Sequence, residues 1–201
     1  MPRRLWSGCV LSETTTDNLA YYDTNIWVAW LFGRSDPFFS QAKALIGKVT
    51  SGEKTVVLSH LVIMETIHVL RHKIAKNSRF VDASPGSIRN VEDQIRKNVG
   101  IFVRTVSEFA RQRQALIVAP NISLRDHHRS VLDALKRHGG QVKTTSGQKY
   151  SYKGLGHADL EHVLLAKYSN VREFHSGDKS FEDLKEDSDF KDINFNILQP
   201  V

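Results

Sequence analysis

Short apolar runs alternate with longer amphipathic segments along most of the chain. Each run is continuous, rich in β-branched or aromatic residues and flanked by polar residues, which is the pattern of a buried β-strand. Strands are therefore expected at residues 19–22, 55–58, 115–118, 171–175 and 193–198.

Between these runs, apolar residues recur at the spacing of an α-helix that buries one face. Helical segments are expected at residues 26–32, 37–50, 60–70, 91–109, 124–138 and 157–168. Pro37 suits the first position of its helix, and Ser59 and Ser123 suit the capping positions of theirs. Residues 78–87 contain proline, glycine and serine and predict a loop.

Strands that alternate with helices predict a mainly parallel central sheet with helices on both faces, an α/β fold of three layers. The 201 residues suit one domain, or at most two. We expect a polar N-terminal lead over residues 1–18 and a single domain over residues 19–201. The segment near residues 139–156 is expected to be a basic insertion, either a hairpin or a loop.

Composition removes several classes of protein. The single cysteine, Cys9, excludes an internal disulfide and makes a reducing cytoplasm the simplest location. No apolar run approaches the roughly 20 residues of a membrane-spanning helix, so we expect no membrane protein. Lys and Arg outnumber Asp and Glu by 28 to 22, and this net charge of +6 favours a polyanionic partner.

The charge is unevenly placed along the chain. Between Ala134 and Ala158 there is no acidic residue. Lysines there could pair with phosphates and tyrosines could stack on bases, so the segment is a candidate RNA-contacting surface, with a solvated loop as the alternative. Its candidate contact residues are Lys143, Lys149, Tyr150, Tyr152 and Lys153.

Acidic residues fall where an α/β sheet binds its ligands, at the carboxyl ends of the strands. Asp23 ends the first expected strand, and Glu65 lies about two turns into the helix after the second. Asp159 opens a later helix, and Asp178 follows the strand at 171–175. Carboxylate oxygens favour Mg²⁺ or Mn²⁺ over Zn²⁺, and such an ion can activate water against a phosphodiester.

The segments that carry these acids resemble, in order, the motifs of PIN-domain ribonucleases, especially the VapC-type toxins. They are residues 21–25 (YYDTN), 57–65 (VLSHLVIME), 157–160 (HADL) and 176–181 (SGDKSF). The resemblance implies a three-layer PIN-like fold and a cytoplasmic endoribonuclease that depends on Mg²⁺ or Mn²⁺ and leaves a 5′-phosphate on its RNA product. It also implies a homodimer and, for a toxin, a cognate antitoxin protein.

Residue by residue, the resemblance assigns catalysis and metal binding to an acidic quartet, and the orientation of ligands or water to neighbouring polar residues. The quartet is Asp23, Glu65, Asp159 and Asp178, and the polar residues are Thr24, Asn25 and Ser176. Some family members carry another acid two residues after the last one, where this chain has Ser180. The number of metal ions therefore stays open.

Other interpretations of these residues remain. Each acid could instead serve as a helix cap, a turn residue or an ion-pair partner. His68 and His72 lie four residues apart on the Glu65 helix and could bind zinc, although no third ligand is evident. The protein could also be a PIN nuclease of RNA processing, or an RNA-binding module without activity. A haloacid-dehalogenase-like phosphatase needs an acid two residues after Asp23, where the chain has Asn25.

Overall fold

The centre of the molecule is a five-stranded sheet in which neighbouring strands run parallel. The computed structural model describes residues 18–77, 85–118, 123–139, 141–145 and 149–200. Its sheet has the strand order β3-β2-β1-β6-β7. These strands are β1 (Leu19–Tyr22), β2 (Thr55–Ser59), β3 (Ala115–Val118), β6 (Glu173–Ser176) and β7 (Asn194–Ile197).

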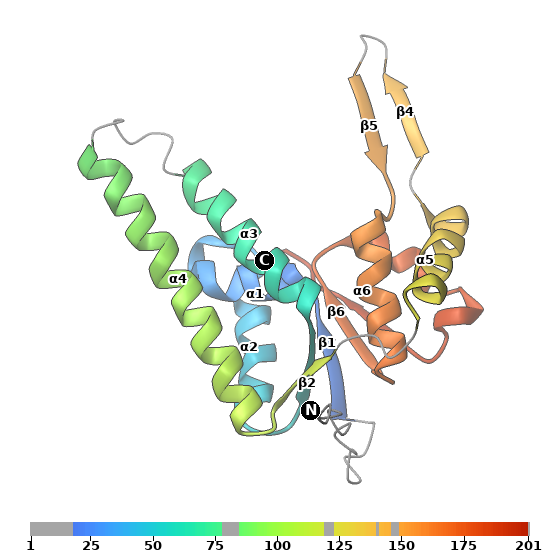
Figure 1. Ribbon diagram of the computed structural model, residues 1–201, viewed down its shortest axis with the longest axis horizontal. Helices are drawn as coiled ribbons and strands as arrows, with labels where there is room; N and C mark the ends of the chain where they lie inside the picture. Colours follow the sequence, from blue (N-terminus) through green and yellow to red (C-terminus); the bar gives the residue numbers. More distant parts are fainter. Residues whose placement is uncertain (1–17, 78–84, 119–122, 140, 146–148, 201) are drawn as a thin grey trace, which may run out of the picture.

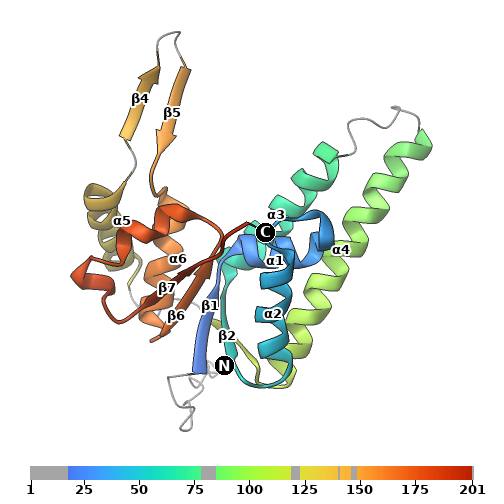
Figure 2. The same cartoon turned by 180° about the vertical axis from the view of Figure 1, so that it is seen from behind.

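Helices cover both faces of this sheet (Figures 1 and 2). One layer consists of α1 (Thr24–Phe32), α2 (Phe39–Thr50), α3 (His60–Asn77) and α4 (Pro85–Arg111). The other layer consists of α5 (Leu124–His138) and α6 (His157–Tyr168), and the short 3₁₀ turns η4 (Lys179–Leu184) and η5 (Ser188–Phe190) connect β6 to β7. The prediction of a three-layer α/β fold with a parallel central sheet is confirmed.

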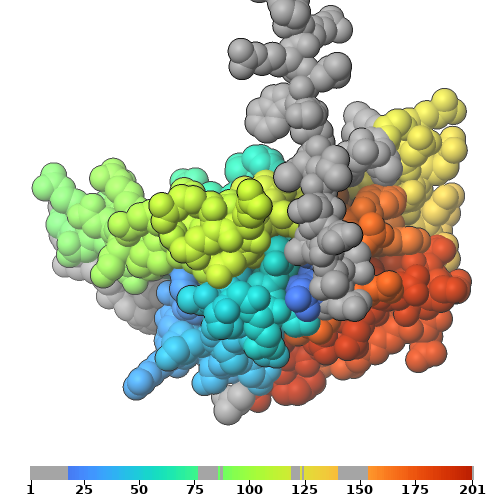
Figure 3. Space-filling model, turned by 90° about the horizontal axis from the view of Figure 1, so that it is seen from below, coloured from blue at the N-terminus to red at the C-terminus, as the bar shows by residue number. Residues whose placement is uncertain are grey.

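The longest described helix, α4, forms a green ridge along one flank of the molecule, opposite the red C-terminal segments (Figure 3). Its 27 residues would be long enough to cross a bilayer. Its exposed positions, however, include Arg89, Glu92, Asp93, Arg96 and Lys97. Among the described residues, no helix combines the length and the apolar character needed to span a membrane.

The middle strand β1 is buried on both faces, and its aromatic residues anchor the elements around it. The ring of Tyr21 stacks on Phe174 from β6, with 5.3 Å between ring centroids. The indole of Trp27 on α1 packs against Phe102 on α4 and donates a hydrogen bond to the carbonyl of Tyr22 (3.2 Å). The end of β1 and the start of α1 are therefore held together by core packing.

The predicted start of the helix at residues 37–50 is wrong by two residues. α2 begins at Phe39, and Pro37 belongs to the turn before it. The carboxylate of Asp36 accepts a hydrogen bond from the Phe38 N–H and forms an ion pair with Lys73 on α3, both at 3.0 Å. This contact with a distant helix stabilises the turn, so the tertiary structure overrides the local preference for proline at the first helical position.

The loop predicted at residues 78–87 is too long at its C-terminal end. α4 already begins at Pro85, and proline is favoured at the first helical position because that N–H has no partner in the helix. Residues 78–84 of the predicted loop lie outside the described residues. The expected caps at Ser59 and Ser123 are present, since their hydroxyl oxygens accept the N–H groups of Val62 and Asp126 (both 3.1 Å).

The basic insertion forms a hairpin, which decides between the two alternatives left open by the sequence. Strands β4 (Gln141–Thr145) and β5 (Lys149–Lys153) pair antiparallel. At the base of the hairpin a β-bridge joins Gly139 to Leu155, and Leu155 is fully buried. The hairpin and the paired helices α3 and α4 both project from the body at the end of the sheet where β1 ends (Figures 1 and 2).

Candidate metal and active site

Asp23 directly follows β1 and caps the N-terminus of α1. Its backbone N–H donates to the carbonyl of His175 on β6 (3.0 Å), so the pairing of β1 with β6 sets its position. Its Oδ1 atom accepts a hydrogen bond from the Thr24 N–H (2.7 Å), as a helix cap does. Asp23 is 6% exposed. Asp23 therefore caps α1 and also lies at the carboxyl end of the central strand.

Two polar side chains hold the other carboxylate oxygen of Asp23. The Nδ2 group of Asn25 and the hydroxyl of Ser176 each donate to Oδ2 at 2.7 Å. The Oδ1 atom of Asn25 accepts the N–H of Gly177 (2.8 Å), and the Oγ atom of Ser176 accepts the N–H of Asp178 (3.0 Å). This network connects the end of β1 to the segment after β6, and it orients the Asp23 carboxylate.

Glu65 reaches the same place from α3. This helix starts directly after β2, so its first turns lie at the carboxyl end of the sheet. The Oε2 atom of Glu65 accepts a hydrogen bond from the Thr24 hydroxyl (2.7 Å) and lies 2.8 Å from the Nε2 atom of His162 on α6. Thr24 thus links Glu65 to the Asp23 cap.

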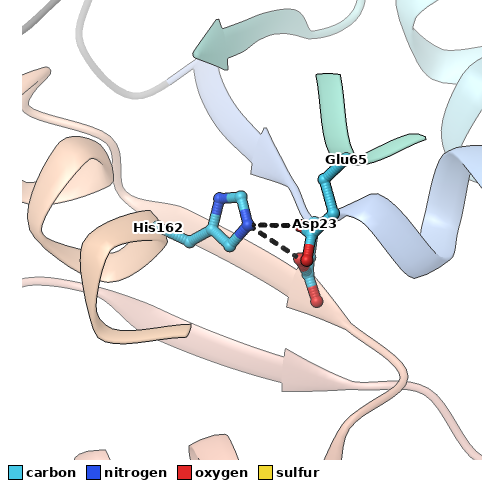
Figure 4. Close-up of side chains that lie close together, drawn as sticks. All are labelled: Asp23, Glu65 and His162. Carbon is cyan, nitrogen blue, oxygen red and sulfur yellow. Dashed lines mark hydrogen bonds and ion pairs between the residues drawn. The ribbon is translucent and has the colours of Figure 1, made fainter. Parts of the chain in front are cut away.

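His162 completes this group, and the sequence-based set of site residues does not contain it. The side chain is 1% exposed and points from α6 toward Asp23 and Glu65 (Figure 4). Its Nε2 atom is 3.9 Å from Oδ1 of Asp23. One ligand atom from each of Asp23, Glu65 and His162 lies within 4.8 Å of the other two, which is the spacing of a possible metal site.

One sequence signal could have indicated His162. It follows Asp159 by three residues, about one helical turn, so both side chains lie on the same face of α6. The signal is weak, because a histidine in an apolar helix can equally pack in the core, and the chain has nine histidines. Only the packing of α6 against β1 places this imidazole beside the two carboxylates.

Asp159 and Asp178 line the same pocket but do not belong to the group of three residues. The pocket has a volume of about 300 Å³, and its walls include all four acids of the predicted quartet. The carboxylate of Asp159 accepts the N–H of Gly156 (2.7 Å), and that of Asp178 accepts the N–H of Ser180 (2.8 Å). Both acids thus stabilise the start of a helical segment and also face the pocket.

Burial and neighbouring charges shift the pKa values of the groups in this site. Burial raises the pKa of Asp23, although His162, Ser176 and the Thr24 N–H oppose this. Burial and the nearby Asp178 also raise the pKa of Asp159. The hydrogen bond from His162 holds the pKa of Glu65 below its usual value. Burial alone would lower the pKa of His162, but the hydrogen bond to Glu65 and the charge of Asp23 raise it overall.

The donor set fits a divalent cation. Carboxylate oxygens crowded in a buried place repel one another, and a cation among them removes that repulsion. Oxygen donors suit Mg²⁺ and Mn²⁺, and a single imidazole nitrogen is compatible with Mn²⁺. Asp23, Glu65 and His162 are the residues placed to hold such an ion, with Asp159 and Asp178 on the wall of the same pocket.

Two other predicted features contribute no described residue to the lining of this pocket. Only the backbone of the hairpin is described, so the side chains of its candidate RNA contacts, Lys143, Lys149, Tyr150, Tyr152 and Lys153, lie outside the described part of the chain. The rings of His68 and His72 are 5.0 Å apart on α3. Within the described residues, no acid or further histidine joins this pair to form a metal-binding group.

The fold and the pocket together define a class of protein. A parallel α/β sheet with acids from separate segments gathered at its carboxyl ends forms a ligand site in which a divalent cation could activate water. The family model of the PIN domain matches residues 20–187. The chain therefore belongs to the PIN-domain family, a family of nucleases, and it carries a buried acidic cluster. No curated protein matches the sequence.

Proposed function

We propose that this protein is a metal-dependent endoribonuclease whose catalytic site is the acidic pocket. One observation carries the proposal: Asp23, Glu65, Asp159 and Asp178, from four separate segments, line one pocket at the carboxyl ends of the strands. The proximity of Asp23 and Glu65 to each other supports their role as metal ligands.

Each group has a role that follows from its surroundings. When bound, a divalent ion supplies charge neutralisation at the phosphodiester and a water of lowered pKa. Thr24 and His162 hold Glu65, while Asn25 and Ser176 hold Asp23, so both ligands are oriented before any ion binds. Asp159 and Asp178 are the two remaining carboxylates on the pocket wall, so one of them would accept the proton of the attacking water.

The test is RNA cleavage by the purified protein in Mg²⁺, in Mn²⁺ and in EDTA. We expect cleavage with either ion and none in EDTA. Asp23→Asn should lower the cleavage rate at least about a hundredfold, because it removes a charged ligand while keeping the shape and most hydrogen bonds of the side chain. The matched control is Asp133→Asn, which changes an exposed acid on α5 and should leave the rate unchanged.

Two results would overturn this assignment. One is equal cleavage by Asp23→Asn and the wild-type protein. The other is salt-dependent RNA binding without cleavage in any divalent ion, which would indicate an RNA-binding module instead.

We also propose that the nuclease is the toxin of a VapBC-type pair and acts in the cytoplasm as a homodimer. The order of the four acidic motifs supports this role. Overproduction should arrest growth, and co-expression of a neighbouring antitoxin gene should relieve the arrest. Normal growth on overproduction of an active nuclease would instead favour a role in RNA processing.

A further inference from the structure

We propose that His162 is a nitrogen ligand of the metal ion and that it makes the site select Mn²⁺ over Mg²⁺. This inference rests on the proposed function, since it concerns the same metal site. It assigns to that site a ligand that none of the four acidic motifs contains, and one that only the tertiary structure reveals.

The distances around Nε2 of His162 fit those between ligands of one ion, and the shorter of them is also that of a hydrogen bond to Glu65. In an octahedral site with bonds of about 2.1 Å, adjacent ligand atoms are about 3 Å apart and opposite ones about 4.2 Å. The Nε2 atom lies 2.8 Å from Oε2 of Glu65 and 3.9 Å from Oδ1 of Asp23. Both separations fall close to this range, so no large movement of α6 is needed for ligation.

The other ring nitrogen has the partner that a metal-binding histidine usually has. A ligating histidine donates its second N–H to an oxygen atom, which sets both the tautomer and the ring orientation. The Nδ1 atom of His162 is 2.8 Å from the hydroxyl of Tyr21, which is in turn 2.9 Å from Oγ of Ser59. These partners are buried. Metal binding would release the Nε2 proton, and with the Nδ1 N–H held by these partners the Nε2 lone pair is then available to the ion.

The nitrogen donor determines which ion is preferred. Mg²⁺ is a hard cation that binds oxygen and keeps several waters. Imidazole is a softer ligand than a carboxylate, so it favours first-row transition ions such as Mn²⁺ over Mg²⁺. A site with two carboxylates and one imidazole should therefore bind Mn²⁺ more tightly than a site built from carboxylates alone, whereas Mg²⁺ gains little.

The competing role for His162 is that of a positioning residue, which would only donate a hydrogen bond to Glu65. Electron spin echo spectroscopy of the Mn²⁺-loaded protein separates the two roles, because it detects nitrogen bonded directly to the ion. We expect ¹⁴N modulation in the wild-type protein, and its replacement by ¹⁵N coupling when the protein is made with ¹⁵N-histidine. Both measurements use the unaltered protein.

His162→Gln assigns the nitrogen and tests the selectivity. It should abolish the nitrogen coupling and lower the ratio of Mn²⁺ to Mg²⁺ affinity by at least about tenfold, as measured by competition binding. His128→Gln, which alters an exposed histidine on α5, is the matched control and should change neither. Circular dichroism checks that each variant is folded.

The outcomes distinguish this inference from the proposed function. Bound Mn²⁺ without nitrogen coupling would overturn the role of His162 and leave the nuclease proposal standing on its oxygen ligands. An unchanged affinity ratio in folded His162→Gln would also overturn it. A protein that binds neither ion would overturn both the inference and the metal-dependent nuclease.

Discussion

At the scale of single residues, each group of the site has its own partners within the protein. Asp23 accepts hydrogen bonds from Thr24, Asn25 and Ser176, and Glu65 accepts one from Thr24. Hydrogen bonds within the fold therefore position the carboxylates of Asp23 and Glu65. In the metal-free protein, the imidazole of His162 lies beside both carboxylates, and its raised pKa favours the charged imidazolium.

This arrangement predicts a pH window for the stability of the metal-free protein. The folded pKa of His162 is raised from 6.5, so its contribution is fully present below that value and is lost as pH rises through the raised pKa. The folded pKa of Glu65 is lowered from 4.5, so its contribution is present above that value and is lost as pH falls through the lowered pKa. The pair therefore stabilises the fold most between pH 4.5 and 6.5.

Urea unfolding in EDTA checks this window. The difference in unfolding free energy between the wild-type protein and His162→Gln should be largest within the window and should shrink as the pH rises above it. His128→Gln, at an exposed position on α5, is the control and should show only a small difference. A difference for His162→Gln that does not change with pH would mean that the imidazole is neutral in the folded protein.

At the scale of elements, the β4–β5 hairpin is an appendage whose removal should leave the domain folded. The β-bridge between Gly139 and Leu155 brings the two ends of the insertion together, so a short linker can replace residues 141–153 with little loss of chain entropy. The excised segment contains Lys143, Lys149 and Lys153, which we propose to contact RNA phosphates.

Removal of the hairpin should weaken RNA binding and reduce its dependence on salt. Loss of three phosphate contacts should lower the slope of log affinity against log salt by about 2 for single-stranded RNA. Filter binding over a range of salt concentrations measures this slope. The matched variant keeps the hairpin and replaces the three lysines by glutamine. It should lower the slope of log affinity against log salt by the same amount. Unaltered affinity in both variants would mean that RNA binds elsewhere.

At the scale of the whole molecule, the site joins segments that are far apart in the chain. Asp23 follows β1, Glu65 lies on α3, His162 lies on α6 and Asp178 follows β6. An ion shared by these segments binds the folded chain and not the unfolded one. Metal binding must therefore stabilise the fold.

We expect Mn²⁺ at a hundred times its dissociation constant to raise the free energy of unfolding by about 2.7 kcal/mol. Thermal unfolding with and without the ion measures this effect. Asp133→Asn should retain it, whereas Asp23→Asn should lose most of it, since a ligand is gone. A shift of equal size in Asp23→Asn would place the ion outside the acidic pocket.

The sequence by itself determined the class of fold, the position of most elements and the location of the acids. Buried strands and amphipathic helices leave different periodicities, and local capping preferences mark the helix starts at Ser59 and Ser123. Asp23 and Asp178 were placed by their order after strands, because parallel strands bring their carboxyl ends to one edge. These features depend on residues near one another in the chain, so a sequence pattern can carry them.

Only the tertiary structure decided which groups meet. The register of β1 with β6 sets Ser176 beside Asp23, and the packing of α6 brings His162 between Asp23 and Glu65. The ion pair of Asp36 with Lys73 stabilises the turn that contains Pro37, and α2 begins after this turn, at Phe39. Each of these contacts joins residues distant in the chain, and its free energy exists only when several elements are packed. A local sequence pattern does not indicate such a contact. The sequence could therefore predict an acidic pocket but not the histidine in it.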